Sequence, residues 1–133
     1  MIDRRQKILV VDDLPDWRKT LKGLLADEGY EVEVADSLSS ASTSLKGRQF
    51  DLVVADVRLD ESDVNNTDGL ELATMVKEQY PGIKVILITG YETQAVVERA
   101  MIPNAEGESL VADFITKAQI SELLQIVSRV LMH

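Results

Sequence analysis

The sequence predicts an α/β fold, a doubly wound five-stranded parallel sheet with helices on both faces. Two observations predict it. Five short strand-like runs alternate with segments long enough for helices, and this alternation is typical of a parallel sheet. The first, third and fourth runs are continuously apolar, as strands covered on both faces are. The runs span residues 8–11, 32–35, 52–55, 85–88 and 113–116.

The length and composition of the chain indicate one domain. It has 133 residues, of which 45% are hydrophobic, close to the commonest size of a compact domain. We therefore expect a single domain over residues 1–133. The formal net charge of −9 argues against nucleic acid and anionic membrane as direct partners, because both require a basic face.

No targeting or membrane segment is evident in the sequence. No apolar run approaches the roughly 20 residues of a membrane span, and the N-terminal residues lack the apolar stretch of a signal peptide. Cysteine is absent, which excludes a disulfide framework and a thiolate metal site. A cytoplasmic location is the resulting expectation.

The segments between the runs carry helix signals in chain order. Pro15 suits the first turn of the first helix and Gly29 its end, and Ser37 suits the N-cap of the second. Asp68 and Glu71 have the spacing of a capping box at the start of the third. Apolar residues recur at helical spacing in the first helix at Trp17, Leu21, Leu24 and Leu25, and in the last at Ile120, Leu123, Leu124, Val127, Val130 and Leu131.

The second and fifth runs are interrupted by polar residues, which favours them as the edges of the sheet. The strand order is then 2-1-3-4-5, the flavodoxin-like order of doubly wound sheets. Two polar stretches, residues 60–67 and 103–109, are expected to be loops. Pro103 is expected to end or kink the fourth helix.

Polar side chains stand where the predicted strands end. Asp12 and Asp13 follow the first run, Asp56 the third, Thr89 the fourth and Lys117 the fifth. Ligands of doubly wound sheets bind beyond the carboxyl ends of the strands, and neighbouring strands lie roughly 5 Å apart. The aspartates can therefore share one small cation. Magnesium is the natural choice, because it prefers hard oxygen ligands and binds through one or two carboxylates plus a phosphate.

These residue types suit phosphoryl transfer, in which positioning and charge neutralisation do most of the catalysis. Asp56 is the candidate nucleophile. Lys117 is placed to neutralise a phosphoryl oxygen, and the Thr89 hydroxyl to donate a hydrogen bond to another.

Five motifs in this order resemble the receiver domains of two-component response regulators. The resemblance covers nearly the whole chain. The motifs are ILVVDD at 8–13, DLVVAD at 51–56, DGLE at 68–71, VILITG at 85–90 and FITK at 114–117.

The resemblance implies roles for the residues of these motifs. Asp56 would be the phosphoacceptor, Asp12 and Asp13 the magnesium-binding acidic pair, Thr89 the switch hydroxyl and Lys117 the phosphate-contacting lysine. Two further roles follow by the same resemblance: the backbone carbonyl of Arg58 would bind the metal, and Phe114 would be the switch aromatic. The cofactor would be Mg2+.

The resemblance also implies a function and partners. The chain would be a phosphoacceptor switch, not an enzyme with an external substrate, in a phosphorelay with a sensor histidine kinase or histidine phosphotransfer protein. Phosphorylation would change the surface formed by helix four, strand five and helix five, from about Tyr91 to His133, which is the expected partner region for a downstream effector. A homodimer is a further partner that the sequence leaves open.

The sequence departs from the family pattern at three places. Ala118 follows Lys117 where the family has proline, so we expect a trans bond there, because a cis bond before a non-proline residue is costly. The interval from Asp56 to Asp68 is longer than usual, and its acidic insertion at 60–63 would be either a lid near the phosphate or a solvated loop. A second expansion at 102–109 adjoins helix four, which predicts a remodelled output surface. Bulky Arg58 and Tyr91 favour slow loss of the phosphoryl group.

Two alternative functions remain open from the sequence. Ala118 and the expanded loops are compatible with a receiver-like interaction module that works without phosphorylation. A phosphatase with an aspartyl intermediate is disfavoured, because the Asp-x-Asp spacing of that chemistry is missing at the end of the first run.

Overall fold

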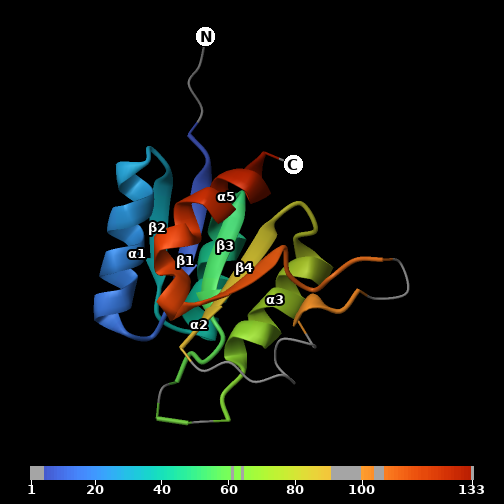
Figure 1. Ribbon diagram of the computed structural model, residues 1–133. Helices are drawn as coiled ribbons and strands as arrows, with labels where there is room; N and C mark the ends of the chain where they lie inside the picture. The colour runs from blue at the N-terminus through green and yellow to red at the C-terminus, as the bar shows by residue number, and fades with distance from the viewer. Residues whose placement is uncertain (1–4, 61, 64, 91–99, 104–106, 133) are drawn as a thin grey trace.

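The computed structural model describes residues 5–60, 62–63, 65–90, 100–103 and 107–132. Strands and helices alternate along the chain (Figure 1). The strands are β1 Lys7–Val11, β2 Glu31–Ala35, β3 Leu52–Asp56, β4 Lys84–Thr89 and β5 Asp113–Thr116. The helices are α1 Pro15–Asp27, α2 Leu38–Gly47, α3 Asp68–Gln79, the 3-10 helix η1 Lys117–Glu122, and α5 Leu123–Leu131.

The five strands form one parallel sheet in the order β2-β1-β3-β4-β5. This confirms the predicted fold class, the strand order and the two edge strands. The fully apolar run of β3 is buried along its whole length in the centre, whereas β5 at the edge buries only Ile115. Continuous burial on both faces is what a central parallel strand requires.

Helices cover both faces of the sheet, as Figure 1 shows, with α1 and α5 on one face and α2 and α3 on the other. Side chains of successive strand residues point to opposite faces. In β1, Ile8 and Val10 pack beneath α1 and α5, and Leu9 and Val11 beneath α2 and α3. Two apolar layers, one on each side of the sheet, therefore hold the carboxyl ends of the strands in place.

Most predicted helix ends are confirmed. Pro15 opens α1, and Gly29, with a φ of 98°, follows the end of that helix in the left-handed conformation that favours glycine. Ser37 caps α2 through its side chain, which accepts from the Ser40 backbone N–H.

One prediction about a helix start was wrong. Asp68 and Glu71 form no capping box; Thr67 is the N-cap of α3 without a side-chain bond, and the Asp68 N–H donates to Asn66 Oδ1 at 3.0 Å. The apolar residues assigned to the last helix divide between two elements: Ile120 lies in the 3-10 helix η1 and the others in α5.

The two polar stretches contain neither helix nor strand in their described residues, as predicted. Ala100 and Met101 are helical and Pro103 is not, which agrees with the expected end of helix four; residues 91–99 lie outside the described residues. In the described ranges, no helix is long and apolar enough to span a membrane.

Candidate functional site

Three aspartates meet at the carboxyl edge of the sheet. Asp12 follows β1 and Asp56 ends the neighbouring β3, and the register of Val11 with Ala55 places them almost level. Asp12 is 1% and Asp56 3% exposed. One carboxylate oxygen from each of Asp12, Asp13 and Asp56 lies within 4.8 Å of the others. The structure thus brings together the acidic residues that the sequence predicted; we call these three residues the carboxylate cluster.

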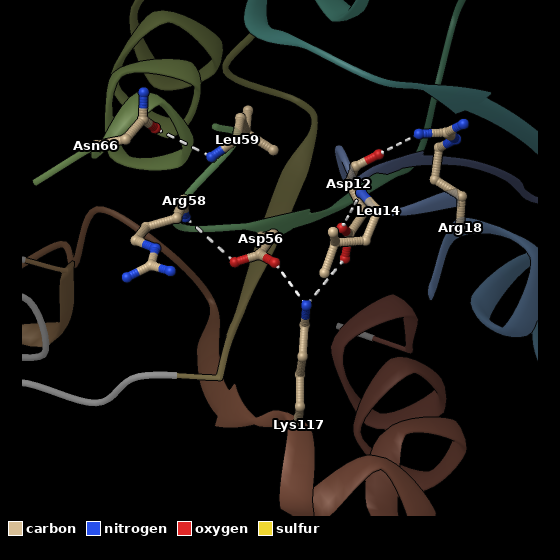
Figure 2. Close-up of polar contacts among 8 residues, drawn as sticks. All are labelled: Asp12, Leu14, Arg18, Asp56, Arg58, Leu59, Asn66 and Lys117. Atoms are coloured by element: carbon tan, nitrogen blue, oxygen red, sulfur yellow. Dashed lines mark hydrogen bonds and ion pairs between the residues drawn. The ribbon is translucent and has the colours of Figure 1, made fainter. Parts of the chain in front are cut away.

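Lys117 points into the carboxylate cluster from the β5 side (Figure 2). Its Nζ lies 2.8 Å from Asp56 Oδ2 and 3.5 Å from Asp12 Oδ2, and its side chain is 11% exposed. The described residues contain no cis peptide bond, so the predicted trans bond between Lys117 and Ala118 is confirmed. The lysine therefore reaches the predicted phosphoacceptor without the proline of the family pattern.

Backbone groups hold the two buried aspartates. Asp12 Oδ1 accepts from the Leu14 N–H at 2.9 Å, and Asp56 Oδ1 accepts from the Arg58 N–H at 3.2 Å. Arg18 Nη1 donates to the backbone carbonyl of Asp12 at 2.9 Å (Figure 2). These bonds orient both carboxylates before any ligand arrives.

Two residues that sequence reasoning did not assign to the site also support it. Arg18 is one, and the only sequence signal for it was its place one turn into α1. The other is Gly69: a Cβ there would lie 2.1 Å from the carbonyl oxygen of Asp56. Helix α3 therefore packs directly on the backbone of Asp56, and the Asp68-Gly69 dipeptide was the available signal.

The carboxylate cluster carries more negative charge than Lys117 neutralises. Burial raises the pKa of Asp12 to about 6, with the charges of Asp56 and Asp13 adding to the effect and the Leu14 N–H and Lys117 opposing it. Asp12 Oδ2 is buried and accepts no hydrogen bond from the described residues. A set of hard oxygen donors with surplus negative charge suits Mg2+.

The other predicted site residues lie around the carboxylate cluster. Thr89 ends β4, is 1% exposed and pairs in register with Thr116. Phe114 is half-buried on β5 and packs against the apolar layer beneath α2 and α3. Arg58 directly follows β3, and Tyr91 lies outside the described residues.

Comparisons with known proteins agree with this geometry. The family model of the response regulator receiver domain matches residues 8–128. The nitrogen assimilation regulatory protein NtrX of Azorhizobium caulinodans is 31% identical over 91% of this chain. The chain spans only 25% of the length of that relative.

Solved structures of receiver domains superpose on nearly the whole chain. A signal receiver domain of an HD domain-containing protein from Pseudomonas fluorescens Pf-5 is 29% identical and has a TM-score of 0.82, with 98% of this chain and 97% of that one covered. The response regulator TrrA of Thermotoga maritima, in complex with Mg2+-BeF, is 28% identical with a TM-score of 0.73, and 94% of this chain and 98% of that one are covered.

Proposed function

The chain belongs to the family of response regulator receiver domains, and on that premise we propose that it is a phosphorylation-dependent signalling switch with Asp56 as phosphoacceptor. One observation carries the proposal. The Asp56 carboxylate is buried at the sheet edge, beside two further carboxylates and 2.8 Å from the Lys117 ammonium. A carboxylate held by a backbone N–H next to a fixed cation is arranged for attack on an anionic phosphoryl group.

The reaction forms a bond between a carboxylate oxygen of Asp56 and phosphorus, and the bond from phosphorus to the donor breaks. The donor leaves with the electron pair of that bond. Lys117, already beside Asp56 Oδ2, neutralises charge on a phosphoryl oxygen, and the Thr89 hydroxyl donates a hydrogen bond to another. Burial excludes water from the nucleophile, which strengthens both interactions.

Mg2+ is the proposed cofactor, which Asp12, Asp13, Asp56 and the backbone carbonyl of Arg58 would hold. When bound, it would neutralise negative charge on the carboxylates and on a phosphoryl group. The donor chemistry of the carboxylate cluster supports this choice, as does the complex of the related TrrA with Mg2+-BeF.

The proposed donor is a sensor histidine kinase or a histidine phosphotransfer protein, and the proposed reader is a downstream effector. Thr89 moves toward the phosphoryl group, and Phe114 turns into the space it vacates. The surface formed by helix four, β5 and α5 changes as a result. The support is positional: Thr89 and Phe114 lie on the neighbouring strands β4 and β5.

Intact-mass spectrometry tests the proposal. The protein is incubated with Mg2+ and acetyl phosphate, alongside Asp56→Asn and the matched loop variant Asp60→Asn, whose carboxylate is exposed. We expect one phosphoryl adduct in the wild type and in Asp60→Asn, and none in Asp56→Asn. A wild type that stays unmodified with histidine-kinase donors as well would instead favour an interaction module that works without phosphorylation.

A further inference from the structure

Lys117 is contacted by an aromatic ring as well as by carboxylates. Its Nζ lies 4.8 Å from the centroid of the Trp17 ring, inside the roughly 6 Å range of a cation–π interaction. Trp17 belongs to the first turn of α1 and packs against the apolar layer beneath α1 and α5. We propose that Trp17 is the positioning residue of Lys117, an inference that rests on the proposed function of Asp56.

Lys117 also contacts two charged groups, and these contacts explain why its contact with the neutral Trp17 ring matters. Asp56 Oδ2 and Asp12 Oδ2 hold the ammonium at 2.8 and 3.5 Å, yet both carboxylates are also assigned to the metal and the phosphoryl group. The ring of Trp17 has no charge and no role in either bond. Its attraction for the ammonium therefore persists when the carboxylate oxygens are engaged.

The backbone around Lys117 is irregular, so the contacts of the side chain determine the position of its ammonium. Lys117 follows the edge strand β5 and opens η1, in which Gln119 has the non-helical angles φ −97° and ψ 19°. The peptide bond to Ala118 is trans. Because apolar packing holds Trp17 in α1, its ring gives the lysine ammonium a fixed contact 4.8 Å from the ring centroid.

The chain provides an internal control for this contact. Lys7 Nζ lies 5.8 Å from the Phe50 ring centroid, and Lys7 begins β1, at the end of that strand opposite Asp12. Phe50→Leu removes a cation–π contact of the same kind, and also costs apolar packing, without touching the carboxylate cluster. If Trp17 contributed only to packing, Trp17→Leu would leave the rate of phosphoryl uptake unchanged, as we expect for Phe50→Leu.

The experiment compares initial rates of phosphoryl uptake from acetyl phosphate with Mg2+ for wild type, Trp17→Leu, Trp17→Phe and Phe50→Leu. Circular dichroism first confirms that each variant is folded at the assay temperature. We expect Trp17→Leu to lower the rate roughly 3- to 10-fold, Trp17→Phe to restore most of it, and Phe50→Leu to match the wild type. Equal rates for wild type and Trp17→Leu, or for the Leu and Phe variants, would overturn the inference.

Fluorescence separates this inference from the proposed function. Trp17 is the sole tryptophan, so its emission reports the ring directly, without metal or phosphate. Lys117→Met should change the emission, whereas Lys7→Met should leave it as in the wild type. Unchanged emission in Lys117→Met refutes the contact, while a wild type that takes up no phosphate refutes the function of Asp56.

Discussion

Asp56 and Lys117 meet at 2.8 Å, but the structure holds them by different means. Asp56 ends β3, the central strand whose five residues are all buried, and α3 packs on its carbonyl at Gly69. Lys117 follows β5, an edge strand in which only Ile115 is buried, and side-chain contacts place its ammonium.

The two residues are therefore positioned by different parts of the structure. Asp56, the proposed nucleophile, is fixed by the backbone of the sheet, so we expect its position to change little when a ligand binds. The Lys117 ammonium contacts Asp12, Asp56 and Trp17 among the described residues, and the two carboxylates are also the proposed ligands of the metal. We therefore expect changes at Lys117 to alter the rate of phosphorylation more than stability, and changes beside Asp56 to alter stability first.

The largest effect is expected for Lys117→Met. Loss of the ammonium removes charge neutralisation from the phosphoryl oxygens, and comparable groups contribute about 10²- to 10³-fold to a rate. Phosphorylation by acetyl phosphate should slow by that factor. The affinity for Mg2+, measured by calorimetry, should rise, because a cation no longer competes for the Asp12 and Asp56 carboxylates. Lys7→Met is the matched control. A weaker Mg2+ affinity in Lys117→Met would contradict competition between the lysine and the metal for the two carboxylates.

The next effect concerns how the buried charge of Asp12 makes the free energy of unfolding depend on pH. Burial raises its pKa from 3.8 to about 6, so between these values the folded state holds more protons than the unfolded state. The contribution of Asp12 to the free energy of unfolding then falls as pH rises through this window, by up to about 3 kcal/mol for a shift of this size. Urea unfolding in EDTA from pH 4 to 7.5 measures it.

Asp12→Asn should remove this fall and make the metal-free protein more stable at pH 7.5. Asp63→Asn, at an exposed loop position, should keep the wild-type pH dependence. Mg2+ should stabilise the wild type more at pH 7.5 than at pH 5, because the metal and the proton compete for the same carboxylate. An Asp12→Asn variant with the wild-type slope would disprove the assignment of the slope to Asp12.

A smaller effect is expected for Gly69→Ala. The added Cβ would lie 2.1 Å from the Asp56 carbonyl oxygen and 2.7 Å from the Val57 Cα, so the helix or the strand must shift. We expect a loss of about 2 kcal/mol in the free energy of unfolding. Gly23→Ala in α1, where a Cβ meets nothing within 4 Å, should stabilise by about 0.5 to 1 kcal/mol. Equal changes in the free energy of unfolding for the two variants would show that the packing of α3 does not hold the end of β3 in place.

The parts of the molecule that the sequence predicted are those set by periodicity. Continuous apolar runs identify central strands, and parallel strands place their carboxyl ends at one edge, so the order of the sheet and the meeting of Asp12 with Asp56 followed. Periodicity did not separate η1 from α5, because Ile120 continues the apolar spacing although its segment is a 3-10 helix.

The contacts that sequence reasoning missed depend on how α1 packs, whether the two residues are six positions apart, as Arg18 and Asp12 are, or a hundred, as Trp17 and Lys117 are. Neither the Arg18 bond to the Asp12 carbonyl nor the Trp17 contact with Lys117 has a spacing rule, because each depends on how α1 lies against the sheet edge. The capping box at Asp68 failed for a local reason: Asn66 already accepts from the Asp68 N–H.

Borohydride trapping shows which aspartate carries the phosphoryl group, which we expect to be Asp56. Borohydride reduces an aspartyl phosphate to homoserine, and peptide mass spectrometry then identifies the position. After incubation with Mg2+ and acetyl phosphate, homoserine should appear at position 56 and at no other aspartate. Homoserine at Asp12 or Asp13, or at none of the aspartates of a protein that carries the adduct, would contradict the account.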